Sequence, residues 1–348
     1  MARIGISLLT LVPGIVGGSE TYARELCRQL AATGEHEYRA FVPAIARDAG
    51  DGLPTTVVHG YRASRTTRGR LAAMGHAAVS RRVRRELELD RLDAVHFPLS
   101  VMLPEVKRPP AATTILDVQH EFLPGFFSRA ELTYRRLVYK RTARASRRVI
   151  TISEHARETL VERMGLAPER VHAIHFGVDH SRFRPSAAPR EDFLLYPANR
   201  WPHKNHERLF AAAEGLGRRL VLTGSGHEGK PAPPFVDVRG RVPGDELVRL
   251  LQTCAALVFP SLYEGFGQPP LEAMACATPV AVSDIPPLRE VCGDAASYFD
   301  PSDPDAIAAG IEEALRRGGD AGPARAAGFT WERCAREHDA VYTALLAD

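Results

Sequence analysis

Short apolar runs alternate with longer amphipathic stretches along the chain. Arg3–Leu8, Tyr38–Pro43 and Ala94–Pro98 have the length and composition of buried strands. Thr66–Glu88 instead carries leucine, methionine and valine at helical spacing, which predicts a helix or a helix pair. Strands that alternate with helices predict an α/β fold of doubly wound parallel sheets, with ligands at the carboxyl ends of the strands.

The other predicted elements continue this alternation. The remaining predicted strands are Thr55–His59, Ala112–Val118, Arg148–Ile152, Val171–Ile174, Phe193–Ala198, Arg219–Thr223, Phe235–Val238, Ala255–Phe259 and Pro279–Ser283. The predicted helices include Ser19–Ala32 with Ser19 as its N-cap, Ala130–Ala145, Asn205–Gly215, Gly244–Thr253, Leu271–Cys276, Asp303–Arg316 and Trp331–Leu346. A chain of 348 residues with this pattern suits two domains.

A glycine turn follows the strand Ala255–Phe259 and precedes a helix. In this turn Gly265 and Gly267 flank Phe266, so backbone can approach a ligand with no Cβ in the way. Such a turn offers free N–H groups and the positive end of a helix dipole to an anion. Two acidic residues accompany it, one in the turn and one eight positions later in the helix. Acids beside a phosphate cradle fit the hydroxyl groups of a ribose and a sugar.

The stretch E-G-F-G-Q-P-P-L-E, residues 264–272, resembles the E-x7-E motif of retaining glycosyltransferases of family 4, which have the two-domain GT-B fold. The flanking segments A-M-A-C-A-T-P-V-A-V-S and E-V-C-G-D-A-A also match that family. The resemblance implies that Glu264 and the backbone of Gly265, Phe266 and Gly267 hold the donor sugar, and that Glu272 holds the ribose. The plainer alternative is a surface glutamate and a glutamate that stabilises a helix dipole.

The resemblance also implies domain limits. An N-terminal Rossmann-like domain is expected over residues 1–180 and a donor domain over 181–330, with a cleft between them. The helix in 331–348 is expected to return to the first domain. One departure is Ala277, where the family usually has glycine, and only a small local effect is expected from it.

Arg200 and Lys204 are four residues apart, follow a predicted strand and enter a helix. A pyrophosphate above the sheet edge would meet a forked donor from the arginine and a point charge from the lysine. Cations at a helix N-terminus oppose the dipole unless an anion is bound. The resemblance assigns this basic pair to neutralising the leaving diphosphate; the alternative is a charged helix end with no ligand.

Three further loops gain roles only from the resemblance. Gly17 and Gly18 would approach the donor diphosphate and the acceptor, Gly224 would line the donor site, and Arg241 and Val242 would meet the nucleobase through their backbone. Each of these loops is also explained by a structural turn. The first loop does not match G-x-G-x-x-G, which argues against a dinucleotide site of the usual kind.

A candidate in the first domain lies in I-L-D-V-Q-H-E-F, where Asp117 ends a predicted strand and His120 follows in the loop. Family members commonly read H-D-L-Q-H, and their first histidine lies near the reacting centre. Here that position is Leu116, so His120 is the expected contact to the donor sugar or the acceptor, with Asp117 near it. A surface-loop histidine and a strand-end aspartate are the alternative.

The five cysteines are scattered and form no C-x-x-C or Cys/His cluster, so neither a disulfide framework nor zinc is indicated. No run of 18 apolar residues and no signal peptide is apparent, so a cytoplasmic protein is expected. Residues 1–180 carry 27 Lys+Arg against 19 Asp+Glu. This excess predicts either peripheral association with the inner face of a membrane or merely solvated, arginine-rich helices.

The resemblance implies a retaining glycosyltransferase that moves a hexose from a nucleotide-diphosphate sugar to a glycan, lipid-linked or natural-product acceptor. It implies no cofactor besides this co-substrate, no metal and no nucleic acid partner. W-P-H-K-N-H and Q-H-E-F-x-P-x-F-F resemble bacterial mannosyl- and rhamnosyltransferases, which favours GDP-mannose. Two alternatives stay open: a nucleotide-sugar epimerase of the same fold, and an inactive sugar-nucleotide-binding protein, which Leu116 would favour.

Overall fold

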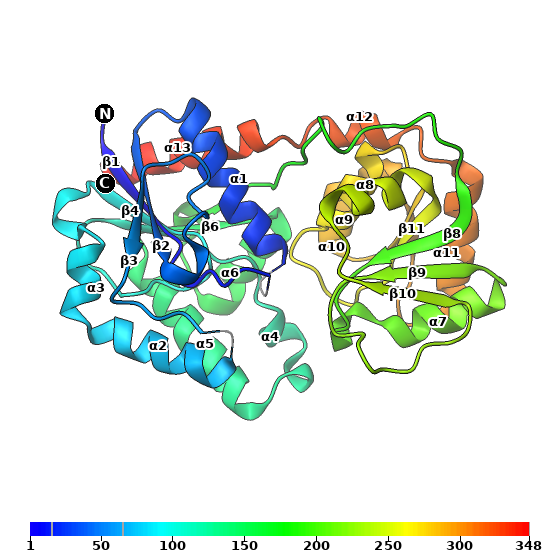
Figure 1. Ribbon diagram of the computed structural model, residues 1–348, viewed down its shortest axis with the longest axis horizontal. Helices are drawn as coiled ribbons and strands as arrows, with labels where there is room; N and C mark the ends of the chain where they lie inside the picture. The colour runs from blue at the N-terminus through cyan, green and yellow to red at the C-terminus, as the bar shows by residue number, and fades with distance from the viewer. Residues whose placement is uncertain (15–16, 65, 348) are drawn as a thin grey trace. The chain divides into compact units, whose positions relative to one another are not determined.

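The computed structural model describes residues 1–14, 17–64 and 66–347, which divide into two compact units (Figure 1). Unit 1 contains residues 1–177 and the chain from Trp331 onward, and unit 2 contains residues 178–330. The first boundary therefore lies three residues before the expected limit at residue 180. The last helix belongs to unit 1.

Unit 1 is built on a seven-stranded parallel sheet in the order β3-β2-β1-β4-β5-β6-β7. Its strands are β1 (Arg3–Ser7), β2 (Glu37–Pro43), β3 (Thr55–Val58), β4 (Ala94–Phe97), β5 (Ala111–Thr114), β6 (Arg148–Thr151) and β7 (Val171–Ala173). Its helices are α1 (Gly18–Thr33), α2 (Thr67–Val79), α3 (Arg81–Glu86), α4 (Gln119–Phe122), α5 (Arg129–Ala145), α6 (Glu154–Met164) and α13 (Trp331–Ala347). Every residue of β4 and β5 is buried, as expected for parallel strands covered on both faces.

Unit 2 is built on a six-stranded parallel sheet in the order β10-β9-β8-β11-β12-β13. Its strands are β8 (Glu191–Pro197), β9 (Arg219–Thr223), β10 (Val236–Gly240), β11 (Cys254–Phe259), β12 (Val280–Ser283) and β13 (Ser297–Phe299). Its helices are α7 (His206–Gly215), α8 (Gly244–Thr253), α9 (Gln268–Ala275), α10 (Pro286–Cys292), α11 (Pro304–Arg317) and α12 (Gly322–Ala326). The central strands β8 and β11 pair directly, for example Leu195 with Leu257.

Both sheets have the strand order of doubly wound folds, which confirms the predicted fold class. In each, the first strand of the unit lies in the middle and the chain winds outward in both directions. The winding changes direction between β1 and β4 in unit 1 and between β8 and β11 in unit 2. Ligands of such sheets bind outside the carboxyl ends of the strands at this switch point.

Apolar side chains fill the space between sheet and helices. In unit 1 one buried cluster includes Phe41, Val83 and Phe97 and joins the β2–β4 side of the sheet to α2 and α3. A second buried cluster, with Val149 and Leu160, joins β6 to α6. All five cysteines are buried thiols, consistent with small core residues.

Helix α13 packs on α1, β4 and β5 through buried polar groups. The Tyr22 hydroxyl lies 2.8 Å from both Thr114 Oγ1 and His338 Nε2. The Tyr342 hydroxyl lies 2.8 Å from His96 Nδ1. The other ring nitrogen of His96, Nε2, lies 2.8 Å from Thr114 Oγ1. Buried polar groups are expensive unless they are paired, so this network specifies one position for α13.

Local structure corrects three predictions. Helix α1 begins at Gly18 with Gly17 as N-cap, so Ser19 is not the cap. Strand β5 ends at Thr114, and Asp117 therefore lies beyond the strand rather than at its end. The sequence pattern does not predict α10, which has seven residues, or β13, which has three. Segments this short do not show a clear hydrophobic periodicity.

Candidate functional site

A shielded charged contact at the carboxyl edge of the unit 2 sheet joins Lys204 to Glu264. Lys204 ends a short 3-10 helix, Pro202–Lys204, that follows β8, and Glu264 lies in the turn after β11. Lys204 Nζ lies 2.5 Å from Glu264 Oε1, and each side chain is 13% exposed. The ammonium also lies 5.0 Å from the centroid of the Phe259 ring, a cation–π contact. Two predicted site residues that are far apart in sequence thus meet with little access to water.

The next residue, Asn205, holds this turn in place. Its φ of 60° lies in the left-handed region that asparagine tolerates. Its side-chain amide donates to the carbonyls of Pro260, at 3.0 Å, and Pro301, at 2.7 Å. Since Pro260 follows β11 and Pro301 follows β13, one buried amide ties the Lys204 turn to the loops after two other strands.

Two further hydrogen bonds fix the backbone around Lys204. The buried Tyr196 hydroxyl donates to the Lys204 carbonyl at 2.7 Å. The Leu262 amide donates to the His203 carbonyl at 2.8 Å. The first bond therefore fixes the Lys204 turn to β8, and the second joins it to the turn after β11.

Arg200, the other predicted cation, is anchored on the opposite side of the same loop. Its guanidinium donates to the Pro231 carbonyl at 3.2 Å and to Glu207 Oε1 at 2.9 Å, and its side chain is 15% exposed. It does not touch Lys204 or Glu264. Both cations nevertheless act on one imidazole, that of His206. Burial is the main reason why the pKa of His206 falls to about 3, and the charges of His227, Arg200 and Lys204 lower it further. The two positive charges thus share the space around His206.

Gly224 lies where the turns after β8 and β9 touch. Its φ is 118°, and a Cβ there would lie 2.7 Å from the carbonyl carbon and oxygen of Ala198. Beside it, Asn199 Oδ1 accepts from the amide and hydroxyl of Ser225 at 2.7 and 2.9 Å. The Arg200 amide donates to the Ser225 carbonyl at 2.9 Å. A glycine is therefore required at 224 to let the two turns approach, whatever ligand they hold.

Arg241 and Val242 follow β10 and continue this edge. Arg241 is exposed and Val242 is half-buried. Glu228 accepts hydrogen bonds from its own backbone N–H and from that of Gly226, and these bonds lower the pKa of its carboxyl. The charge of Arg241 lowers this pKa further. Arg241 therefore lies near the loop after β9, as a shared edge requires.

The predicted glycine turn is a tightly packed start of α9. Gly267 caps the helix with a φ of 128°, and a Cβ on it would lie 2.7 Å from Leu288 Cδ2. The Phe266 ring is 3% exposed and packs edge-to-face on Phe329, with centroids 6.1 Å apart. In this arrangement Phe266 and Gly267 offer a ligand their backbone rather than a side chain. Gly265 is half-buried.

Glu272 lies within α9 and is half-buried. Burial raises the pKa of its carboxyl to about 7, while a hydrogen bond from Gln268 and the charge of Arg182 lower it. The Gln268 amide nitrogen lies 3.3 Å from Glu272 Oε1. A carboxyl that titrates near neutral pH can either accept or donate a hydrogen bond to a hydroxyl group.

The candidates in unit 1 belong to the carboxyl ends of β1 and β5. Gly17 and Gly18 are exposed, and a Cβ on either would meet nothing within 4 Å. Gly17 has φ 55° and ψ −128°, a conformation that glycine favours. Asp117 Oδ1 accepts from the Gln119 amide at 3.1 Å at the start of α4.

His120 has a different environment from the one expected. Its side chain is fully buried, and its ring packs edge-to-face on Tyr139 at 5.2 Å between centroids. Burial lowers the pKa of His120 to about 4 although Glu121, at 3.6 Å, opposes this effect. Its imidazole is neutral at pH 7 and reaches no solvent in this structure, so a contact with substrate stays a prediction.

Comparison with known families decides the class. The family described as Glycosyltransferase Family 4 matches residues 16–182, and the family described as Glycosyl transferases group 1 matches residues 178–326. The chain belongs to the family 4 glycosyltransferases. The two matches meet within a few residues of the boundary between unit 1 and unit 2.

This glycosyltransferase resembles several characterised proteins. It is 26% identical over 268 residues to the O-antigen chain mannosyltransferase B of Escherichia coli, covering 68% of this chain and 70% of the relative. It is 29% identical over 205 residues to the O-antigen chain mannosyltransferase RfbU of Salmonella typhimurium, covering 55% of this chain and 56% of the relative. The solved structure of Anabaena HepE in complex with UDP-glucose has a TM-score of 0.73 at 15% identity, covering 99% of this chain and 100% of HepE.

The edge of the unit 2 sheet assembles predicted and unpredicted residues of this glycosyltransferase. The strands β10, β9, β8 and β11 are neighbours, so the turns that carry Arg241, Gly224, Arg200, Lys204 and Glu264 follow one another along one edge. Sequence analysis missed Asn205, Tyr196 and Asn199, whose hydrogen bonds hold those turns. The signal that could have found Tyr196 and Asn199 is a polar side chain close to a strand end, and for Asn205 it is an asparagine directly before a predicted helix.

Among residues 1–14, 17–64 and 66–347, no three His, Cys, Asp or Glu side chains gather as a metal centre would require. No helix in those ranges combines the length and apolar character needed to span a bilayer.

Proposed function

We propose that this enzyme is a retaining glycosyltransferase that moves a hexose from a nucleotide-diphosphate sugar to a glycan, lipid-linked or natural-product acceptor. The names of the two O-antigen mannosyltransferases support mannose and a polysaccharide acceptor, which makes GDP-mannose the first donor to test. The complex of HepE with UDP-glucose supports a nucleotide-sugar donor for this fold.

The observation that carries the proposal is the shielded Lys204–Glu264 pair at the switch point of the unit 2 sheet. A donor diphosphate arriving there supplies Lys204 with a second acceptor, and the charge of Arg200 adds to the same field. As the bond between the anomeric carbon and the phosphate oxygen breaks, negative charge grows on the diphosphate, and fixed cations stabilise it most at that moment. Glu264 is then available to accept hydrogen bonds from sugar hydroxyls.

In the proposed reaction the acceptor oxygen bonds to the anomeric carbon on the face from which the diphosphate leaves. The departing phosphate oxygen takes the proton of the acceptor hydroxyl, so no protein carboxylate acts as nucleophile. Glu272 binds the ribose hydroxyls, and no divalent metal is needed because protein cations and the start of α9 supply the positive field.

The test is transfer from radiolabelled GDP-mannose and other common nucleotide sugars to lipid-linked and glycan acceptors, with the anomeric configuration of the product read by NMR. The α-linked product from an α-donor, and rates unchanged by EDTA, are expected. An inverted product would overturn the retaining mechanism, and loss of activity in EDTA would overturn the metal-independent one.

A matched pair of variants connects activity to the site. Lys204→Met should lower kcat/KM at least about a hundredfold, since it removes a cation that faces the growing charge. Lys230→Met removes an exposed lysine of the same unit and should leave the rate unchanged. Conversion of the donor sugar without an acceptor would instead identify an epimerase, and tight donor binding without turnover would identify an inactive binding protein.

We also propose that unit 1 associates peripherally with anionic membranes. The exposed fractions of Val79 and Leu137 are 80% and 67%, and they lie on α2 and α5 among arginines. Sedimentation with vesicles of phosphatidylglycerol should weaken with added salt and with Val79→Ser and Leu137→Ser. Absence of vesicle binding at low salt would overturn this part.

A further inference from the structure

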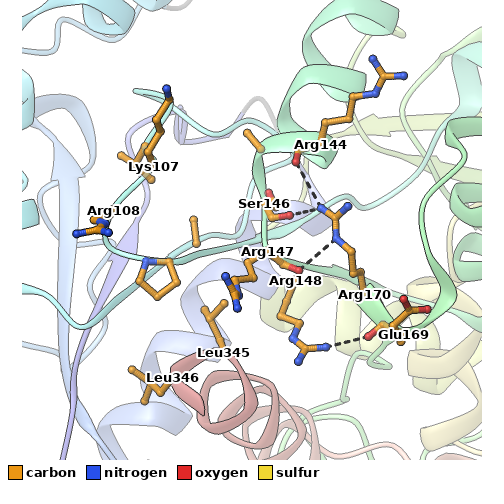
Figure 2. A pocket seen from close by; sticks show the side chains of 14 residues that line it. Lys107, Arg108, Arg144, Ser146, Arg147, Arg148, Glu169, Arg170, Leu345 and Leu346 are labelled. Carbon is orange, nitrogen blue, oxygen red and sulfur yellow. Dashed lines mark hydrogen bonds between the residues drawn. The ribbon is translucent and has the colours of Figure 1, made fainter. Parts of the chain in front are cut away.

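Unit 1 contains a pocket of about 750 Å³ at the edge of its sheet opposite the strand carboxyl ends (Figure 2). Ala111 begins β5 and Arg148 begins β6, so the amino ends of these strands form its floor. The last turn of α13 contributes Leu345 and Leu346. A volume of this size is typical of small-molecule sites rather than of a space for a few waters.

The lining of this pocket is strongly basic. Its cations are Lys107, Arg108, Arg144, Arg147, Arg148 and Arg170. Among the described residues that line it, Glu169 is the single acid. Figure 2 shows Lys107 and Arg108 on one side, Arg144 and Arg170 on the opposite side, and Arg147 between them. Like charges gathered around one hollow repel one another unless an anion joins them.

Part of this charge has a structural explanation. Arg170 donates to the carbonyls of Ala143, Arg144 and Ser146, and so satisfies the last turn of α5. Arg148 donates to the Glu169 carbonyl at 2.9 Å. These two arginines hold the walls of the pocket and do not need a ligand.

Lys107, Arg108 and Arg144 have no such explanation. All three side chains are exposed, and within the part of the chain that the structure describes none of them makes an ion pair or a side-chain hydrogen bond. A second hollow of about 420 Å³ shares Arg144 and Ala145 and adds Lys140, Leu137 and the ion pair of Arg141 with Glu105. The basic surface is therefore continuous over two adjoining hollows and is longer than one monoanion requires.

We propose that this pocket binds a ligand with two or more phosphate groups, held by Lys107, Arg108 and Arg144. Arginine forks and a lysine point charge are the donors that phosphate oxygens prefer. The pocket is lined by residues of unit 1 alone, and it lies at the opposite sheet edge from Gly17 and Asp117. The same chemistry is presented by a soluble diphosphate and by a phosphorylated lipid headgroup.

The first experiment uses inorganic pyrophosphate and tripolyphosphate with the full chain in isothermal titration calorimetry. Because pyrophosphate also fits the proposed donor site, binding is compared in Lys204→Met, which weakens that site alone. A binding event that persists in Lys204→Met is expected, and its dissociation constant should rise about tenfold or more in Arg108→Ala/Arg144→Ala. The affinity should also fall with added salt.

The matched control is Arg81→Ala/Arg85→Ala, which removes the same charge from α3 of the same unit. Equal weakening by both double variants would overturn the proposal, because net charge rather than a site would then explain it. Absence of binding in Lys204→Met would overturn it as well. Circular dichroism and unchanged glycosyl transfer would establish that the pocket variant is folded.

The second experiment distinguishes the sources. Vesicles of phosphatidylcholine alone and of phosphatidylcholine with phosphatidic acid are sedimented with the wild type and both double variants. Loss of binding to phosphatidic acid in Arg108→Ala/Arg144→Ala alone, with weak pyrophosphate binding, would support a lipid headgroup as the ligand. Tight pyrophosphate binding with vesicle binding unaffected by that variant would support a soluble diphosphate.

Discussion

The Lys204–Glu264 pair gives the sharpest quantitative prediction. We consider Lys204→Met, Glu264→Gln and the double variant. Both charges are 13% exposed and 2.5 Å apart, so removing the lysine leaves a shielded carboxylate with no counter-charge. Removing one partner of a fully buried pair costs 3–5 kcal/mol, and residual solvent access places Lys204→Met at about 2–3 kcal/mol. Glu264→Gln keeps an acceptor for the lysine and should cost about 1–2 kcal/mol.

The double variant should cost less than the sum of the two, with a coupling energy of about 1–3 kcal/mol. Urea unfolding measured by tryptophan fluorescence provides the free energies. The chain has two tryptophans, and Trp201 lies in unit 2 whereas Trp331 lies in unit 1. A Trp331→Phe background therefore makes the signal report on unit 2.

The control cycle uses Arg218 and Asp192, an ion pair of the same unit whose aspartate side chain is 82% exposed. Its coupling energy should stay below about 1 kcal/mol. If Lys204→Met and Glu264→Gln were additive within about 0.5 kcal/mol, the pair would be as well solvated as the control. The shielded electrostatic field proposed for the site would then be refuted.

Four further outcomes are expected. Ala277 has φ 55°, so Ala277→Gly should stabilise unit 2 by about 0.5–1 kcal/mol in urea unfolding. The control Ala275→Gly, within α9, should destabilise unit 2. A lower free energy of unfolding in Ala277→Gly would contradict this prediction. Gly224→Ala should cost at least about 2 kcal/mol and weaken donor binding in calorimetry, because its Cβ would collide with the Ala198 carbonyl. Burial raises the pKa of Glu272 from 4.5 to about 7, so the carboxyl loses its proton first in the unfolded chain, and stability should fall as pH rises from about 4.5 to 7. Glu272→Gln should flatten this fall in stability. Parallel curves of stability against pH for the wild type and the variant would contradict the prediction. Burial lowers the pKa of His338 from 6.5 to about 4, so stability should drop as pH falls from about 6.5 to 4, with a smaller drop in His338→Gln.

The sequence was sufficient to predict every strand of the two sheets except β13, because buried parallel strands are mostly apolar. The strand that begins at Phe193 in the prediction begins at Glu191 in the structure, since the first two residues are exposed and polar. Strand β5 ends four residues before the predicted end, because the apolar residues Ile115 and Val118 are buried beyond the end of the ladder. Burial and strand pairing are different requirements, and composition reports only the first.

The candidate site was predictable where chemistry and spacing coincide. Glu264, Arg200 and Lys204 lie in the turns that follow predicted strands, and parallel topology alone brings such turns to one edge. The contact between Lys204 and Glu264 depends instead on Asn205, whose two carbonyl partners lie 55 and 96 residues away. No pattern in the sequence near Asn205 predicts those partners. The burial of His120 was also hidden, since Tyr139, which covers its ring, belongs to the following helix α5.

The position of α13 has a consequence for biosynthesis. Its segment emerges from the ribosome after unit 2, yet it completes the interior of unit 1. Until then the Tyr22 hydroxyl lacks its partner His338, and the His96 ring lacks its partner Tyr342. Unit 2 is contiguous and can finish folding during translation, whereas the earlier-made unit must wait for the late helix. A nascent chain stalled before Trp331 should therefore expose unit 1, and not unit 2, to protease.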